Sequence, residues 1–515
     1  LVGVDGEVRL ASIYGEFPLF RCTKCKEENI YPTCMKCEST CVKEYYSRAE
    51  DKIYTEDNGE RKLDSYMRRR IDIRKYFDEA KKMLRISGDE IPVVKGVRGT
   101  SNADHSCEHL AKGLLRAKYN LNVNKDGTIR YDMQEAPITH FKPKEIGTSI
   151  QKLKELGYEK DIFGKALEDN EQILEMFPHD VILPSCPETQ DERADDVFFK
   201  ITQFVDDELE KLYKLERYFK ATKKEDIIGV LVANIAPHIC TTTVGRIIGF
   251  SKTQTMLASP FMHAAMRRDC DGDEAASMLL LDMLINFSRK FLPAHRGGTQ
   301  DAPLVLNTQI RAGDVDDQIL DFEAEQYPLE LYRAAEQSKH SSEFDGIKMM
   351  KHRLKNKENP FENIPFTHNC KNINDCVINS SYKLLPSMQE KVAQMMDFCE
   401  KNRAVDTRDV ARLIIERHFI RDTRGNLRKF SQQGFRCVGC NDKYRRPPLT
   451  GRCTKCGGRI IFTISEGSIL KYMQPALDLA KKYKVEPYLL ESLELTEMYI
   501  QSIFGKEKEK QVTLF

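Results

Sequence analysis

The chain has 515 residues, which exceeds the size at which one hydrophobic core keeps growing, so several domains are expected. With 41% hydrophobic and 31% charged residues, the composition excludes a membrane protein and a mainly disordered one. The net charge is only +1, so the overall charge predicts no nucleic-acid partner, and the distribution of charge must be read locally.

Motifs and periodicity divide the chain into seven consecutive regions. We expect, in order, a zinc-binding module at 1–50, a basic helix and strand region at 51–140, a helical region at 141–225, a β-rich region around an Asp-Gly-Asp loop at 226–330, a helical region at 331–430, a second zinc ribbon at 431–466 and a helical tail at 467–515.

Several segments inside these regions carry a clear pattern. The head, 1–50, is poor in strand signals, whereas 61–85 has the apolar spacing of a helix among basic residues. Residues 206–222 predict a charged amphipathic helix, and the Ile-, Val- and Leu-rich stretch 227–239 predicts buried β structure. The broad apolar face at 274–290 predicts a helix.

Location and charge blocks give further expectations. No stretch approaches the roughly 20 apolar residues needed to cross a bilayer, and no signal peptide opens the sequence, so we expect a cytoplasmic protein. The first residue is Leu1 rather than methionine, which suggests a piece of a longer chain. Basic residues dominate 61–85 and 436–459; such blocks are commonly solvated faces, but beside a metal-bound module they favour contact with phosphates.

Eight of the sixteen cysteines form four Cys-x-x-Cys pairs, which in an intracellular chain indicates zinc rather than disulfides. Eight residues separate the first two pairs and twelve separate the last two. Each set can supply four thiolates to one tetrahedral zinc ion with no position left for a substrate, so both zinc ions should be structural. The alternative is reduced, unligated cysteines. The two predicted sets are Cys22, Cys25, Cys34 and Cys37, and Cys437, Cys440, Cys453 and Cys456.

Other cysteines offer weaker possibilities. Cys41 could compete with Cys37 for the first zinc ion. A third site could be built from His368, Cys370 and Cys376, but ligands without Cys-x-x-Cys pairing are more often core or surface residues.

Three aspartates at alternate positions, Asp269, Asp271 and Asp273, are the most informative feature of the sequence. Gly272 permits a sharp bend, so the carboxylates can converge and hold magnesium, which prefers hard oxygen ligands. An EF-hand is excluded, because its glycine and glutamate are missing at the sixth and twelfth positions. A simple acidic turn that caps the following helix is the remaining alternative.

This stretch resembles the catalytic loop of the family D DNA polymerases of archaea. The similarity is carried by 266–287 with its Cys-Asp-Gly-Asp-Glu motif, by 244–250 (Val-Gly-Arg-Ile-Ile-Gly-Phe) before it and by 296–304 (Arg-Gly-Gly-x-x-Asp-Ala-Pro-Leu) after it. Both cysteine modules also lie where the large subunit of that family has them. The resemblance implies an α+β fold with a double-psi β-barrel catalytic core at 226–330, helical insertions and two zinc-ribbon-like modules.

The resemblance also implies the chemistry. Asp271 and Asp273 would hold two catalytic magnesium ions and add deoxynucleotides to a primer 3′ end on a DNA template. Asp269 stands where we expect asparagine in this family, and it is a third candidate ligand. Arg246, Arg267 and Arg268 are candidates for binding phosphate or DNA, although each could equally be a structural ion-pair residue. His263 is more readily explained as a core histidine whose hydrogen bonds are satisfied.

Partners follow from the same resemblance. The family implies a small subunit with a proofreading 3′–5′ exonuclease, primer–template DNA, deoxynucleoside triphosphates and a sliding clamp. The tail 511–515 (Gln-Val-Thr-Leu-Phe) partly resembles a clamp-binding peptide, and a frayed terminus is the alternative. Two other functions stay open: an RNA polymerase-like two-barrel enzyme, suggested by Asp269, and a non-catalytic zinc-ribbon scaffold that binds DNA.

Overall fold

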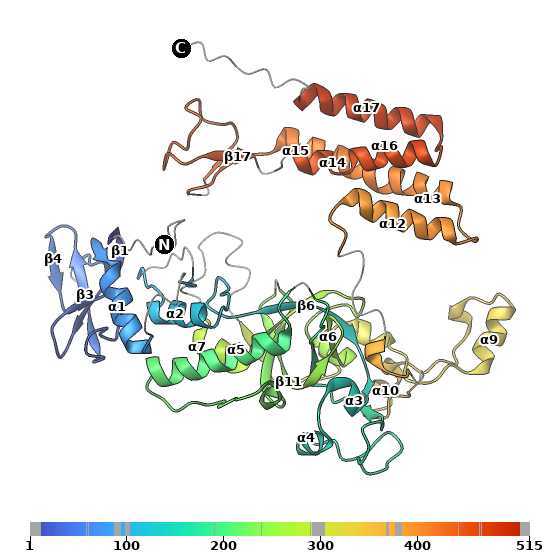
Figure 1. Ribbon diagram of the computed structural model, residues 1–515, viewed down its shortest axis with the longest axis horizontal. Helices are drawn as coiled ribbons and strands as arrows, with labels where there is room; N and C mark the ends of the chain where they lie inside the picture. Colours follow the sequence, from blue (N-terminus) through green and yellow to red (C-terminus); the bar gives the residue numbers. More distant parts are fainter. Residues whose placement is uncertain are drawn as a thin grey trace. The chain divides into compact units, whose positions relative to one another are not determined.

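The computed structural model describes residues 12–57, 59, 61–86, 94–97, 104–189, 191–237, 239–288, 290, 304–366, 370–375, 384–440, 442–462, 464 and 466–504. The chain divides into two compact units, Leu1–Asn379 and Ser380–Phe515, and each is described by itself (Figure 1). The boundary lies inside 331–430, which the sequence analysis treats as one helical region. Among the described residues, no helix combines the length and the apolar character needed to span a membrane.

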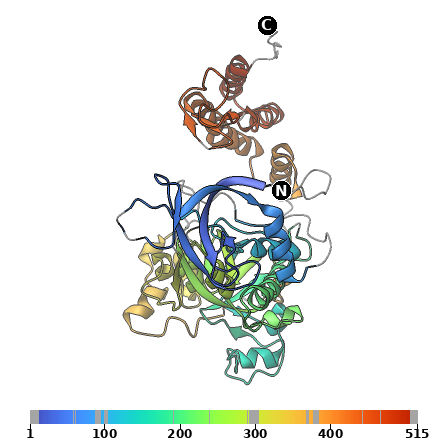
Figure 2. The ribbon, with the colours of Figure 1, turned by 90° about the vertical axis from the view of Figure 1, so that its left-hand side faces the viewer.

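The first unit opens with a small antiparallel sheet of strongly curved strands (Figure 2). The prediction of a strand-poor head was wrong, because short strands separated by cysteine-bearing turns do not produce a long alternating pattern. The strands are β1 (Ser12–Cys22), β2 (Glu28–Asn29), β3 (Cys41–Ser47) and β4 (Lys52–Tyr54) in the order β2-β1-β3-β4, with β5 (Tyr66–Asp72) paired to β1.

A helix follows the basic strand β5, so the helix predicted over 61–85 begins only at Ile73. Helix α1 (Ile73–Leu84) starts at Asp72, whose side chain accepts a hydrogen bond from the backbone N of Arg74. It ends at Arg85, which has a left-handed backbone conformation. The buried face of α1 packs against α2 (Leu110–Lys118) in the main core of the unit.

A larger mixed sheet forms the centre of the first unit. Its strands are β6 (Tyr131–Pro137), β9 (Asp180–Pro184), β10 (Leu231–Ile235), β11 (Thr241–Ser251), β12 (Thr255–Ala258), β13 (Glu274–Leu279) and β14 (Val305–Asn307). The order is β10-β13-β6-β12-β9-β11-β14, and β10 also pairs with β11. Each of the first six strands in this order therefore has a neighbour on both sides, with β14 as a third partner of β11, and these pairings close the six strands into a ring.

This ring corrects two regional boundaries. Its strands β6 and β9 come from 51–140 and 141–225, so 226–330 does not contain the whole sheet. The region 141–225 mixes helices with strands: it holds α3 (Pro143–Ile146), α4 (Ile150–Glu155) and α5 (Ala194–Asp207), but also the strands β8 (Leu174–Glu175) and β9. Gly147 and Gly157, both with positive φ, interrupt the helical pattern there.

Two predicted helices also differ from the structure. The amphipathic helix of 206–222 is instead the end of α5 (Ala194–Asp207), continued by a π-helical turn at Glu208–Leu212. The helix predicted over 274–290 is strand β13 followed by the short helix α7 (Leu280–Asn286). Strand β13 is buried between β10 and β6, and a continuous apolar run of this kind does not distinguish a buried strand from a buried helix.

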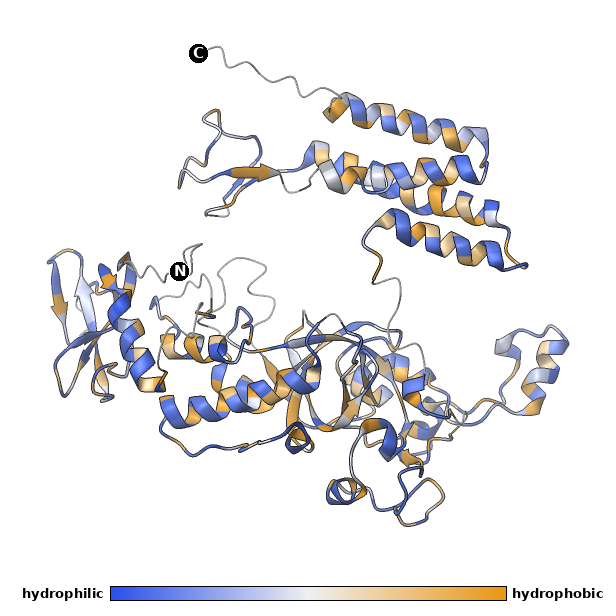
Figure 3. Cartoon of the chain, in the orientation of Figure 1, coloured by the Kyte–Doolittle hydropathy of each residue, from blue (hydrophilic) through white to orange (hydrophobic). Residues whose placement is uncertain are grey.

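The remaining elements of the first unit surround the ring. The helices and strands carry both hydrophobic (orange) and hydrophilic (blue) residues (Figure 3), and the main core contains the fully buried Phe198, Phe204 and Phe261. The peripheral elements are β7 (His140–Phe141), α6 (Pro260–Ala265), α9 (Leu329–Glu336), α10 (Met350–Lys355) and the 3₁₀ turns Lys224–Ile227, Asp317–Asp321, Ser341–Glu343 and Ile373–Asp375.

The second unit is a helical bundle that carries a small three-stranded sheet in the order β16-β15-β17. Its helical core is one cluster that includes Met396, Ile415, Ile469 and Leu493. The elements are α12 (Met388–Lys401), α13 (Thr407–Leu413), a π-helical turn (Ile414–Phe419), α14 (Ile420–Gln432), β15 (Phe435–Cys437), β16 (Lys443–Tyr444), β17 (Ile460–Phe462), α15 (Glu466–Leu470), α16 (Met473–Lys482) and α17 (Pro487–Phe504).

Candidate active site and cysteine clusters

The three aspartates lie on a loop between α6 and β13. Helix α6 starts with Ser259 as its N-cap and ends in a motif that usually requires glycine. The backbone N of Arg267 donates to Ala264 O at 3.1 Å, and that of Arg268 donates to His263 O at 3.0 Å. Arg267 itself has φ 59°, in the left-handed region. This cap turns the chain sharply away from the helix axis and into the acidic loop.

The loop brings the aspartates together. Asp269, Asp271 and Asp273 each offer a carboxylate oxygen, and these oxygens lie within 4.8 Å of one another. Gly272 has φ +102°, a conformation that disfavours any residue with a Cβ, and it makes the bend between the last two aspartates. Asp269 and Asp271 are exposed and Asp273 is half-buried, so the cluster is open to solvent and to a substrate.

One guanidinium and one neutral amide group contact these carboxylates and compensate only part of their negative charge. Arg268 Nη1 lies 3.5 Å from Asp273 Oδ2, and the Asp269 side chain accepts a hydrogen bond from Gln318 Nε2. The backbone N of Asp269 donates weakly to Asp273 Oδ2 at 3.4 Å. Three carboxylates within reach of one another repel unless a cation binds them. A hard oxygen set that is open on one side fits magnesium, which retains water ligands for exchange with phosphate oxygens.

Glu135 on β6 makes hydrogen bonds at both ends of this loop. The sequence analysis did not identify this residue. Its backbone N donates to Asp273 O at 3.0 Å, and its Oε2 lies 2.5 Å from His263 Nδ1 on α6. Both side chains are fully buried. Met133 and Glu135 are two residues apart in β6 and both are buried, so they lie on the same inward face of the strand. A charged residue at a position that the strand pattern reserves for apolar residues is the sequence signal that could have identified Glu135.

His263 is a satisfied core histidine, as the sequence predicted. Its second ring nitrogen, Nε2, lies 3.2 Å from Ala136 O. A carbonyl only accepts, so Nε2 is the donor in this bond. The histidine thus joins α6 to β6 and does not point into the acidic loop.

The candidate arginines separate into two groups. Arg246 on β11 makes a two-pronged ion pair with Asp180, at 2.8 and 2.9 Å, and Tyr158 Oη donates to the same carboxylate at 2.5 Å. Burial raises the pKa of Asp180, although the Arg246 guanidinium opposes this effect. Arg246 is therefore an ion-pair residue inside the sheet, whereas Arg267 and Arg268 lie on the acidic loop.

The first cysteine set is assembled as predicted. Sulfur atoms of Cys22, Cys25, Cys34 and Cys37 lie within 4.8 Å of one another. The backbone N atoms of Lys24 and Cys25 both donate to Cys22 Sγ at 3.4 Å, which stabilises a thiolate at the turn. Cys41 is buried beside this group but is not one of its four members.

The second set lies in the second unit and has the same architecture. Cys437 and Cys456 approach at 3.4 Å, as do Cys440 and Cys453. A Cβ on Gly458 would lie 2.8 Å from Cys437 Sγ, so glycine is required there for the sulfur atoms to converge.

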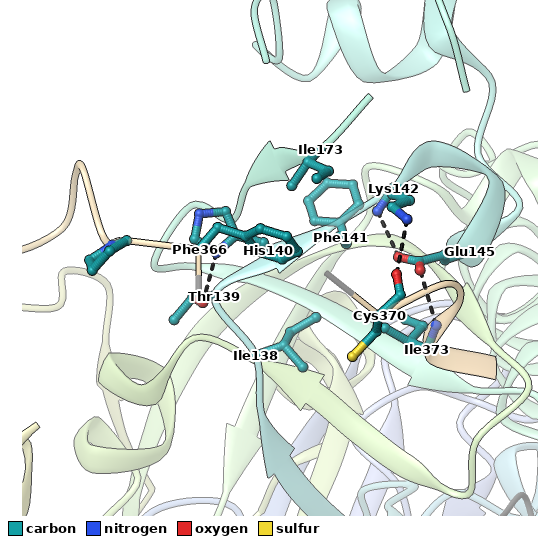
Figure 4. A pocket seen from close by; sticks show the side chains of 11 residues that line it. Ile138, Thr139, His140, Phe141, Lys142, Glu145, Ile173, Phe366, Cys370 and Ile373 are labelled. Carbon is teal, nitrogen blue, oxygen red and sulfur yellow. Dashed lines mark hydrogen bonds between the residues drawn. The ribbon is translucent and has the colours of Figure 1, made fainter. Parts of the chain in front are cut away.

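Of the third cysteine group, the structure describes only Cys370, since His368 and Cys376 lie outside the described residues. Cys370 lines a pocket of about 220 Å³ together with His140 and Phe366 (Figure 4). Lys142 Nζ donates a hydrogen bond to Cys370 O at 3.0 Å, which holds the segment around Cys370 in place. Within the described parts of the chain, the potential ligands gather into three groups: the two cysteine sets and the aspartates.

Comparison with known proteins identifies relatives along most of the chain. The large subunits of DNA polymerase II from Archaeoglobus fulgidus and Nanoarchaeum equitans are each 42% identical over 97% and 96% of this chain, and that of Pyrococcus furiosus is 43% identical over 95%. These alignments cover 43%, 43% and 39% of the relatives, so the chain spans about two fifths of their length.

A family model gives the assignment. Residues 88–391, which are more than half of the chain and include the whole ring and the aspartate loop, match the model described as the catalytic domain of the DNA polymerase II large subunit DP2. The chain therefore belongs to the family of the DNA polymerase II large subunit DP2 catalytic domain.

Proposed function

We propose that this chain carries the nucleotide-adding site of a DNA-directed DNA polymerase that acts in archaeal DNA replication. The observation that carries the proposal is the convergence of Asp269, Asp271 and Asp273 in a chain of this family. The whole relatives are more than twice as long, so residues outside this chain complete the enzyme.

The residues of the loop would divide the work as follows. Asp271 and Asp273 hold the magnesium ions, and Asp269 supports them from the exposed side of the cluster. Bound magnesium supplies charge neutralisation for the nucleotide phosphates and favours deprotonation of the primer 3′-hydroxyl. Arg268, whose Nη1 lies 3.5 Å from Asp273 Oδ2, offsets the charge of Asp273 while the site awaits its substrates. Glu135 and His263 keep the loop in register with β6.

The closed ring of six strands supports a double-psi β-barrel as the finer description of the fold. The ring mixes parallel pairs, β6 with β12 and β9 with β11, with antiparallel pairs between the other neighbours. Closure places the aspartate loop at the start of β13, a strand held on both sides. A rigid strand at the base of a loop restricts the movement of its carboxylates, which pre-organises a metal site.

We propose structural zinc at both cysteine clusters. Four sulfur atoms at each cluster supply the complete tetrahedral set that zinc takes in structural sites, with no open position for a substrate. The first module would then depend on the ion for its fold, because the buried cluster described at this module consists of Cys22, Cys34 and Cys41.

The remaining partners follow from the relatives, whose name is "large subunit". We propose a small partner subunit with the proofreading exonuclease, primer–template DNA, deoxynucleoside triphosphates and a sliding clamp, in the cytoplasm of an archaeon. The clamp-binding tail at 511–515 lies outside the described residues.

Replacing the aspartates by asparagine tests the proposed function. We expect Asp271→Asn and Asp273→Asn in the full-length polymerase to reduce primer extension by at least about 10³-fold, the scale of loss for an essential electrostatic group. Binding of primer–template DNA should survive. The matched control is Asp78→Asn, an exposed aspartate on α1.

Three results separate the alternatives. Unchanged extension in both aspartate variants would refute the catalytic assignment and leave a zinc-stabilised scaffold. Incorporation of ribonucleotides in preference to deoxynucleotides would favour the RNA polymerase-like reading. Anomalous scattering from manganese soaked into crystals should appear beside Asp271 and Asp273.

A further inference from the structure

A polar pocket lies directly beside the acidic loop. It has a volume of about 410 Å³ and is lined by residues of β11, of α6 and its cap, and of the segment 306–315, which begins within β14. Pockets of roughly 300–1,000 Å³ are the usual size for small-molecule ligands. Arg267 is shared between this pocket and the loop, because it is two residues before Asp269.

The segment 306–321, whose first part lines the pocket, is bonded to the acidic loop at several points. Arg267 Nη2 donates to Asp314 O at 3.3 Å, and Arg267 Nη1 lies 3.5 Å from Asp316 Oδ2. Gln318 Nε2 donates to the Asp269 carboxylate. These bonds hold the segment that lines the pocket against the acidic loop, so a ligand in the pocket would lie next to the proposed metal site.

The donors in this pocket suit an anion that carries several oxygen atoms. Two guanidinium groups, Arg267 and Arg311, enter from different segments, and their side chains are 54% and 70% exposed. Asn307 and Thr308 add an amide and a hydroxyl. Guanidinium groups match phosphate oxygens in geometry and stay charged at all relevant pH values.

The side chain of Arg311 makes only a weak ion pair among the described residues. Among the described residues, its ion pair is with Asp314 at 4.0 Å, the outer limit of such a contact, and both side chains are more than two-thirds exposed. Exposed pairs of this kind contribute little to stability. A phosphate group can therefore displace Asp314 from Arg311 at small cost.

We propose that this pocket binds the triphosphate of the incoming nucleotide, with Arg311 and Arg267 as its cationic contacts. The inference rests on the proposed function and names the substrate-binding side of the same site. In this arrangement, Arg311 positions the nucleotide through its phosphates, which all four deoxynucleotides share, and it takes no part in reading the base. When the pocket holds no nucleotide, the guanidinium group of Arg311 pairs with Asp314.

Steady-state primer extension by the full-length polymerase tests the proposal, with Arg311→Gln and Arg311→Lys as variants. We expect Arg311→Gln to raise the KM for each of the four deoxynucleotides about tenfold, the effect of one lost charge-assisted hydrogen bond. Arg311→Lys should recover part of this loss, since it keeps the charge but not the fork. The Kd for primer–template DNA should stay the same. Arg333→Gln, an exposed arginine on α9, is the matched control.

Each other outcome overturns the inference. A raised Kd for DNA with an unchanged KM would place the DNA backbone in this pocket. An effect confined to one or two bases would assign Arg311 to base recognition. No change in either constant would leave the pocket without a role in substrate binding. In all three cases, loss of extension in Asp271→Asn and Asp273→Asn would still uphold the proposed function, so the two failures remain distinguishable.

Discussion

The Oε2 atom of Glu135 lies 2.5 Å from Nδ1 of His263, and both side chains are fully buried behind the aspartate loop. Since Nε2 of His263 donates to a carbonyl, a proton is shared between Nδ1 and the glutamate. The same glutamate holds the loop a second time, because its backbone N donates a hydrogen bond to Asp273 O at 3.0 Å. One residue of β6 thus sets the position of both ends of the acidic loop.

We expect Glu135→Ala to lower the free energy of unfolding by about 3–5 kcal/mol, because it leaves His263 buried without its partner. Primer extension should fall by at least about tenfold through displacement of the loop. Glu135→Gln can still donate to Nδ1 of a neutral histidine, so it should recover most of the activity. Thermal unfolding and extension rates measured on the same preparations check this, with exposed Glu330→Ala as control. If Gln and Ala at 135 were equally inactive, the hydrogen bond would not be what positions the loop.

Asp282 on α7 gives a pH dependence of stability. Burial raises the pKa of this carboxyl to about 6, and nearby Glu208 adds to the effect, while the bonds from Ile129 N and Asn286 oppose it. The folded protein therefore holds this proton more tightly than the unfolded chain. The stabilisation is complete below the unfolded pKa of about 4 and is lost as the pH rises through about 6.

As the pH rises from 5 to 7.5, the titration of Asp282 should lower the free energy of unfolding by about 1 kcal/mol. Asp282→Asn should abolish this part of the pH dependence. Urea denaturation of the wild type and the variant at both pH values measures the difference. The same change at exposed Asp317 should leave the pH dependence as it is. An identical slope in wild type and Asp282→Asn would contradict the assignment.

Metal content tests the membership of the first cysteine cluster. Cys25→Ser should lower bound zinc from about two ions per chain to about one, because a structural site needs all four sulfur ligands. Cys41→Ser should keep both ions, as Cys41 lies beside the cluster and outside its four members. Zinc measured by mass spectrometry after gel filtration decides between them. Loss of zinc in Cys41→Ser alone would make Cys41 the true ligand.

Gly249 on β11 tests the packing of the ring. A Cβ at this position would lie 2.7 Å from both the Cβ and the carbonyl oxygen of Ile146, and the backbone oxygen cannot move aside cheaply. We expect Gly249→Ala to lower the free energy of unfolding by about 1–3 kcal/mol. Gly313→Ala, where a Cβ meets no atom within 4 Å, should change it by less than about 0.5 kcal/mol. Urea midpoints provide the comparison, and equal midpoints for the two variants would argue against the close contact.

Local chemistry was readable from the sequence where the spacing of ligands is itself the signal. The spacing of a Cys-x-x-Cys pair brings its two sulfur atoms to one side of a local turn, so both cysteine clusters were predicted residue by residue. The alternation of Asp269, Asp271 and Asp273 around Gly272 was informative for the same reason, since a bend at glycine brings neighbours together.

Only the tertiary structure decided features that depend on distant partners. The sequence of β13 predicts a helix, because a run of buried apolar residues is compatible with both a helix and a strand. Only its pairing with β6 and β10 shows that it is a strand. The commitment of Arg246 to Asp180 and the two bonds of Glu135 likewise join residues far apart in the chain. Backbone pairing and burial are set by the whole fold, and a local pattern does not contain them.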